Sequence, residues 1–216
     1  MGAITRSIAN NITTSGVFTS SAITNASVTG ITTLANAPAD GITFISSQTA
    51  SNSASLSFTS GLDSTYKAYK FVFSNIHPRT NDVLFTFNGS TDAGSNYNVT
   101  KTTTFFATYH NENDVNTDLS YGSAYDLAQS TSFQNITREI GSGADESAVG
   151  SLTLFNPSST TYVKHFINVG QIYQTGGTTF NNYTAGYCNT TSAVNAVQFK
   201  MASGNMDGTI YLYGIK

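Results

Sequence analysis

The residues best suited to chemistry lie in one acidic stretch, 111–118, with the sequence NENDVNTD. Glu112, Asp114 and Asp118 supply carboxylate oxygens, which are the ligands that calcium prefers. The stretch lacks the central Gly and the distal Glu of an EF-hand loop. We therefore expect a solvated loop, with a structural calcium ion as the alternative, and we assign no metal site and no cofactor.

Catalytic patterns are absent from the sequence. Its three histidines, His77, His110 and His165, are far apart in the chain, and there is no Gly-X-Ser-X-Gly elbow or phosphate-binding Gly loop. A Ser-His-Asp site needs its members to be close only in space, and a hydrolytic head could use acidic pairs drawn from Glu112, Asp114 and Asp145. The expectation is nevertheless a protein that is not an enzyme.

Tyrosines are the second group of candidate functional residues. A tyrosine offers a flat apolar face with a polar tip, which suits both saccharide binding and subunit contact. Two long connections, predicted at 110–132 and 174–187, would present them, because loops of this length are usually functional or disordered. Subunit contact is the favoured role, since sugar stacking would more often use Trp, which is absent. The candidate recognition residues in or beside these connections are Tyr109, Glu112, Asp114, Tyr121, Tyr125, Tyr183 and Tyr187.

The elements that must position these residues are strands. From Gly41 onward, short runs rich in Val, Ile, Phe, Tyr and Thr are bounded by Asn, Gly, Asp, Ser and Pro, which is the strand signal. We expect eight to ten strands and almost no helix. In the last run, Ile210 and Leu212 share one face, while Tyr211, Tyr213 and Ile215 share the other, which predicts a strand that is buried on both sides. The pattern predicts an all-β fold, a jelly-roll-like β-sandwich over residues 41–216.

Residues 1–40 differ from the rest of the chain. Of the nine basic and twelve acidic residues, only Arg6 and Asp40 fall in this segment. We interpret it as an extended N-terminal arm for anchoring or trimerisation, because its scattered aliphatic residues cannot form a core alone. The residues assigned to assembly are Ile4, Ile8, Ile12, Val17, Ile23, Val28, Ile31 and Leu34.

Composition excludes several partners. Charged residues make up 10% of the 216 residues and the net charge is −3, so there is no basic surface for nucleic acid. No run is long and apolar enough to predict membrane insertion, and the N-terminus lacks a secretory pattern, which predicts synthesis in a cytoplasm. Cys188 is the single cysteine, so no intrachain disulfide is possible.

Three stretches carry a resemblance to a known family. FNGSTDAGSNYNVT (87–100), FKMASGNMDGTIYLYGIK (199–216) and AITRSIANNITTSGVF (3–18) are similar to segments of virion structural and tail-fibre-like proteins of tailed bacteriophages, particularly those of marine cyanobacteria. This resemblance implies location in the virion and assembly as a homotrimer. The chain has no repetitive shaft, which favours a short appendage or a head ornament.

The sequence therefore predicts a non-enzymatic phage virion structural protein. It would be a short trimeric fibre-like appendage or a capsid decoration, attached to other capsid or tail proteins by its N-terminal arm. The alternative is a receptor-binding tail-fibre tip that recognises a host cell-surface glycan or protein through its Tyr-bearing loops.

Overall fold

The computed structural model describes residues 41–216, and every regular element in this part is a β-strand. The predicted arm, residues 1–40 with its eight assembly residues, lies outside the described residues. The twelve strands are β1 (Ile42–Ser53), β2 (Leu56–Phe58), β3 (Ala68–Pro78), β4 (Val83–Ser90), β5 (Lys101–Asn111), β6 (Thr117–Tyr121), β7 (Gln134–Ile140), β8 (Ala148–Phe155), β9 (Lys164–Gln174), β10 (Thr178–Cys188), β11 (Ala196–Met201) and β12 (Met206–Ile215).

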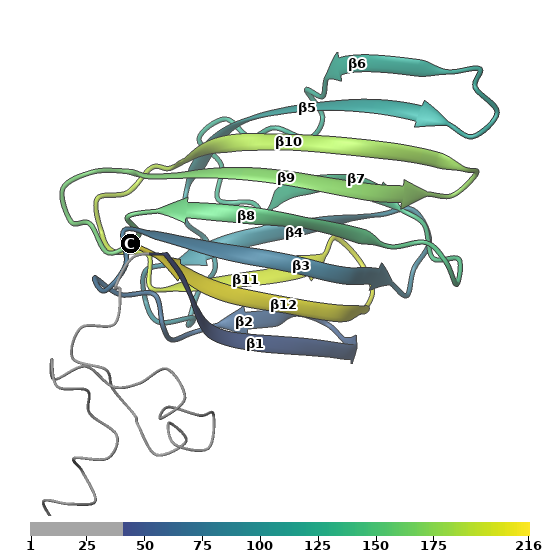
Figure 1. The fold of residues 1–216 in the computed structure, drawn as a ribbon. Helices are drawn as coiled ribbons and strands as arrows, with labels where there is room; N and C mark the ends of the chain where they lie inside the picture. The colour runs from purple at the N-terminus through teal and green to yellow at the C-terminus, as the bar shows by residue number, and fades with distance from the viewer. Residues whose placement is uncertain (1–40) are drawn as a thin grey trace, which may run out of the picture. The chain divides into compact units, whose positions relative to one another are not determined.

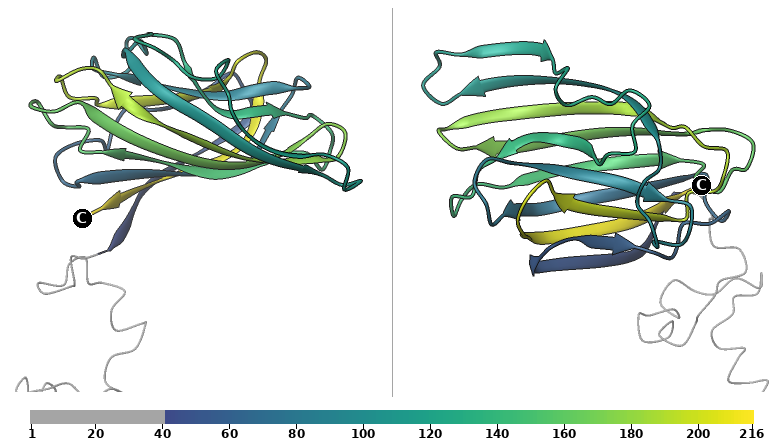
Figure 2. Two further views of the ribbon diagram at one scale, coloured as in Figure 1. Left: turned by 90° about the horizontal axis from the view of Figure 1, so that it is seen from above. Right: turned by 180° about the vertical axis from the view of Figure 1, so that it is seen from behind.

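These strands form two antiparallel sheets that pack face to face as a sandwich (Figures 1 and 2). The large sheet has eight strands in the order β1-β12-β3-β8-β9-β10-β5-β6. The small sheet has four strands in the order β2-β11-β4-β7. No helix in the described part is long and apolar enough to cross a membrane.

The topology is that of a jelly roll with two inserted hairpins. Strands pair in nested order, β1 with β12, β2 with β11, β3 with β8 and β4 with β7, and successive pairs alternate between the sheets. This nesting is how a jelly roll wraps one long hairpin around a common core. The hairpins β5–β6 and β9–β10 are inserted into it, and both extend the large sheet beyond β8.

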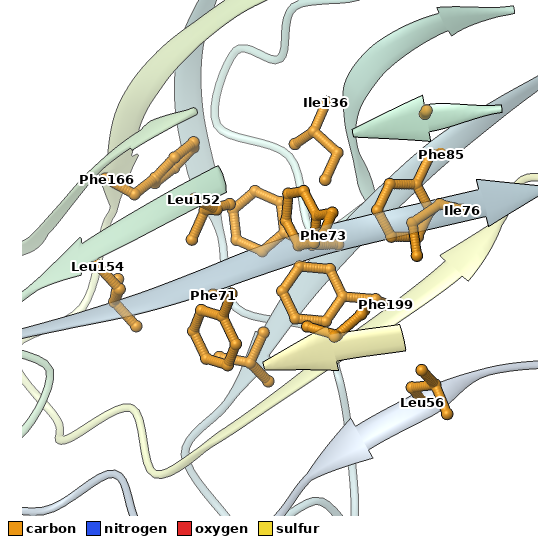
Figure 3. Packing of buried hydrophobic residues seen from close by; sticks show 14 of the residues in the cluster. Leu56, Phe71, Phe73, Ile76, Phe85, Ile136, Leu152, Leu154, Phe166 and Phe199 are labelled. Atoms are coloured by element: carbon orange, nitrogen blue, oxygen red, sulfur yellow. The ribbon is translucent and has the colours of Figure 1, made fainter. Parts of the chain in front are cut away.

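The core between the sheets is rich in phenylalanine. Phe199, on β11, is fully buried at the centre (Figure 3). Its ring centroid lies 5.1 Å from that of Phe71 and 5.2 Å from that of Phe73, both on β3 of the opposite sheet. It also contacts the rings of Phe58, Phe85 and Phe87 within its own sheet. Aromatic pairs at these separations add stability beyond the area they bury.

Polar side chains of the large sheet complete the edge of the small sheet. β7 pairs with β4 on one side only, so part of its backbone lacks a strand partner. Asn168 Nδ2 donates to the carbonyl of Ile136 at 2.8 Å, and Asn182 Oδ1 accepts from the backbone N–H of Arg138 at 3.0 Å. Both asparagines are buried, and their hydrogen bonds offset the cost of removing amide groups from water.

The sandwich prediction is confirmed, but the two long connections were placed wrongly. Residues 174–187 form a tight turn followed by most of β10, and β6 lies inside the predicted connection 110–132. The inward positions of β10 include Asn182 and Thr184, which are buried polar residues. Because they interrupt the apolar alternation, the strand signal was lost.

We predict that Phe199→Ala lowers the free energy of unfolding by about 3–5 kcal/mol, since it removes a fully buried ring that touches both sheets. Urea unfolding followed by fluorescence or circular dichroism measures this loss. Phe155→Ala is the matched control, because Phe155 is 39% exposed. An equal loss for the two variants would contradict the central role of Phe199.

Candidate functional site

The acidic stretch forms the turn between β5 and β6. The side-chain oxygen of Asn111 accepts the backbone N–H groups of Val115 and Asn116, which closes the turn. Asp114 pairs with His110 at 2.9 Å, and Glu112 accepts a hydrogen bond from the hydroxyl of Tyr173 at 3.2 Å. Glu112 and Asp114 therefore have separate local partners, and within residues 41–216 no group of three His, Cys, Asp or Glu side chains is placed to hold a metal.

The three histidines lie apart and have separate surroundings. His77 Nδ1 is 2.7 Å from the backbone carbonyl of Glu146, and His110 pairs with Asp114. His165, on β9, lies beside the ring of Tyr187 at a centroid distance of 6.2 Å. The structure does not bring them together.

Two of the five candidate tyrosines belong to the packing of the domain. Tyr109 lies against Phe180, with ring centroids 5.1 Å apart. Tyr125 stacks on Phe105 at 4.9 Å and donates a hydrogen bond to Glu139 at 2.8 Å. Burial, reinforced by this hydrogen bond, raises the pKa of the Tyr125 hydroxyl. These two residues are structural and do not form a free recognition surface.

The other three candidate tyrosines share the outer face of the large sheet. Tyr121 on β6 is opposite Phe106 on β5, which is opposite Tyr183 on β10. The rings of Phe106 and Tyr183 stack at 4.7 Å with planes only 7° apart. Leu119 lies two residues from Tyr121 on the same face of β6. We call these four residues the aromatic ridge; Leu119 is 68%, Tyr121 57% and Phe106 40% exposed.

A trough of about 520 Å³ lies next to the aromatic ridge. Ala185 gives it a floor, because its short side chain lies between Thr104 on β5 and Ile167 on β9. At Gly186 a Cβ atom would come within 2.5 Å of the backbone oxygen of Thr102, so only glycine allows β10 and β5 to approach this closely. The trough is lined by residues 102–104, 165–167 and 185–187.

Charged side chains are absent from the outer face of β5, β9 and β10, whereas beside β6 the hydroxyl of Tyr121 donates a hydrogen bond to the carboxylate of Asp126. The outward positions of β5, β9 and β10 alternate with their buried positions, and none of them is Asp, Glu, Lys or Arg. Val169 and Ile167 on β9 are 38% and 51% exposed and continue the apolar surface beside Tyr183. Residue type alone identifies Tyr183 and Tyr187 as candidates but not Phe106 and Ile167, because their place on this face depends on β10 joining β5 to β9.

A buried row of ionisable residues was also missed. Cys188 on β10 is in register with Lys101 on β5 and Lys164 on β9, and all three side chains are almost fully buried. Lys101 Nζ donates to the side-chain oxygen of Asn88 at 2.5 Å and to the carbonyl of Val99 at 2.7 Å. Lys164 Nζ likewise donates to two loop carbonyls, those of Tyr162 and Thr190.

Burial governs the protonation of this row. It lowers the pKa of Lys101 to about 8 and lowers that of Lys164 as well, because a charged amine is poorly solvated there. It raises the pKa of the Cys188 thiol to about 11, so the thiol stays neutral and is a poor nucleophile. The row holds strand ends and loops together and has no access to a substrate.

We predict that the free energy of unfolding depends on pH through the side-chain amine of Lys101. The folded state releases this proton near pH 8, while the unfolded chain keeps it to about pH 10.4, so stability rises with pH between these values. From pH 7 to pH 9 the free energy of unfolding of the native chain should gain about 1 kcal/mol relative to Lys101→Met. Urea unfolding of both proteins at the two pH values measures this difference. A constant difference would show that Lys101 does not titrate in this range.

The chain matches no protein-family model, no curated protein and no solved structure. The case for function therefore depends on the residues and their geometry.

Proposed function

We propose that this chain is a non-enzymatic structural protein of a tailed-bacteriophage virion, made in the host cytoplasm and assembled as a homotrimer. It serves as a short fibre-like appendage or as a capsid decoration. The observation that carries the proposal is the outer face of β5, β9 and β10, which has no Asp, Glu, Lys or Arg at its outward positions and where the aromatic ridge and the trough lie side by side. Large exposed apolar patches on a folded domain mark interaction surfaces.

Two of the three stretches that resemble phage proteins, 87–100 and 199–216, form structural parts of the domain. In 87–100, the end of β4 leads into a turn in which Asp92 accepts hydrogen bonds from Ser90 and Asn96. These bonds lower the pKa of Asp92 to about 2 and hold the turn in one conformation. In 199–216, Phe199 is the centre of the core and β12 lies between β1 and β3. These roles favour a scaffold over a catalytic site.

The distribution of the candidate recognition residues favours assembly over receptor binding. Tyr109 and Tyr125 pack inside the domain, while Glu112 and Asp114 lie at the turn between β5 and β6. The remaining residues, Tyr121, Tyr183 and Tyr187, lie on the outer face of the large sheet, where the apolar residues Phe106, Ile167 and Val169 are also exposed. Tyrosine and phenylalanine on such a face are typical of subunit contacts.

Attachment to the virion is assigned to residues 1–40. In this proposal, their eight aliphatic residues pack against other capsid or tail proteins, and the near absence of charge avoids the cost of burying unpaired ions.

We predict that the full chain has a solution mass of three times 22.9 kDa by light scattering. The core lies wholly in the compact unit Asp40–Lys216, so a chain beginning at Gly41 can be measured beside it. If the full chain and the chain that begins at Gly41 are both trimers, the subunit contact lies in the sandwich. If only the full chain is a trimer, the contact lies in residues 1–40. A monomeric full chain at micromolar concentration would contradict the homotrimer.

A further inference from the structure

The side-chain amine of Lys101 and the side-chain amide of Asn88 meet inside the domain. Both side chains are fully buried, and Lys101 Nζ lies 2.5 Å from Asn88 Oδ1. Asn88 belongs to β4 of the small sheet, and Lys101 is the first residue of β5 of the large sheet. An amine that the fold holds against an amide, away from water, is placed to take the acyl group from the amide nitrogen.

We propose that Lys101 and Asn88 join in an isopeptide crosslink within the folded chain. Nζ of Lys101 attacks Cγ of Asn88 and forms a new C–N bond, and the bond from Cγ to Nδ2 breaks. One proton of the amine passes to Nδ2, which leaves as ammonia, so the product is a secondary amide between the two side chains. The step needs no oxidant, reductant or co-reactant. It goes beyond the proposed function and does not depend on it.

The hydrogen bonds of Lys101 fit its neutral form. Nζ donates to Asn88 Oδ1 and, at 2.7 Å, to the carbonyl of Val99, and these two acceptors match the two N–H groups of an uncharged amine. The remaining lone pair is free to turn toward Cγ of Asn88, the atom bonded to Oδ1. Burial also lowers the pKa of Lys101 to about 8, which brings the neutral nucleophile within ordinary solution pH.

The amide of Asn88 is held in one orientation. Its Nδ2 donates to the carbonyl of Tyr97 at 2.8 Å and to that of Thr131 at 2.9 Å. Its Oδ1 accepts the backbone N–H of Gly89 at 2.8 Å, a bond that stabilises the negative charge which this oxygen gains when the amine adds. Thr131 is exposed, so ammonia formed at Nδ2 is released next to the surface.

The crosslink would join two strands that share no ladder. β4 pairs with β11 and β7, whereas β5 pairs with β10 and β6. The chain itself connects β4 to β5 through residues 91–100, and the crosslink would close residues 88–101 into a ring. It would therefore tie the small sheet to the large sheet by a covalent bond.

Lys164 is a control within the same chain. Its side chain is as fully buried as that of Lys101, but the acceptors of its Nζ are two backbone carbonyls, those of Tyr162 and Thr190. Attack on a backbone carbonyl would cut the chain and would not link two side chains. We therefore expect a crosslink at Lys101 and none at Lys164.

Peptide mapping by mass spectrometry of the full native chain tests the proposal. The protein is incubated at pH 9, where the amine of Lys101 is mostly neutral, and is then digested with a protease that cuts before aspartate. The digest places Asn88 in peptide 82–91 and Lys101 in peptide 92–113. The crosslink should join them into one branched species, with the mass of both peptides less one ammonia. Absence of this species after a week at pH 9 overturns the proposal.

Controls separate the crosslink from other losses of ammonia. Asn88 precedes Gly89, so its side chain can also close on the next backbone nitrogen as a succinimide, which loses ammonia but leaves the two peptides apart. Loss of ammonia without the branched species therefore overturns the crosslink. The chain unfolded in guanidinium chloride should give no branched species, because the fold holds the amine against the amide. Lys164→Met, verified as folded by circular dichroism, should still give it, and Lys101→Met should not.

The rate should follow the neutral amine. Cys188 on β10 is in register with Lys101 and stays a neutral thiol, and Lys164 lies beyond it on β9. The amine of Lys101 should therefore set the pH dependence, with a rise in rate of roughly fiftyfold from pH 6 to pH 8. A rate that is the same at both pH values would contradict attack by this amine. The pH effect on unfolding predicted above belongs to the unreacted chain, because the amide product does not titrate.

Discussion

The contact between Phe199 and β3 holds the two sheets together. Phe199 belongs to the small sheet, and its nearest aromatic neighbours, Phe71 and Phe73, belong to the large sheet. Since the chain has one cysteine and few ion pairs among residues 41–216, packing at this centre must supply much of the stability. The nested strand pairs bring these residues together from positions far apart in the sequence.

Many aromatic residues pack in the core, so the surface consists largely of other residue types. Ser, Thr and Asn fill most of the outward positions, as the alternation in β5 and β10 illustrates. Such a surface is polar without being charged, and it tolerates close approach by another uncharged surface. The exposed Phe106 and Ile167 depart from this pattern, because they place apolar side chains where Thr and Asn are the rule.

The sequence was sufficient to predict the sandwich and the inward residues of the last strand. Ile210 and Leu212 are fully buried as expected, because regular alternation reports directly which face of a strand is covered. β10 was missed since its polar residues, among them Asn182 and Thr184, resemble loop composition. The candidate site could be predicted only in part: Tyr183 was identified by residue type, but its stacking on Phe106 depends on a strand register that no local pattern encodes.

The position of β12 determines when the protein can fold. This strand contains almost the last residues of the chain, yet it lies inside the large sheet, between β1 and β3. During synthesis, β1 has no strand partner until Met206–Ile215 leaves the ribosome, because β12 is its only neighbour in the sheet. The sandwich is therefore completed only after Met206–Ile215 has been synthesised, and a nascent chain that lacks β12 exposes the edges of both β1 and β3 to aggregation.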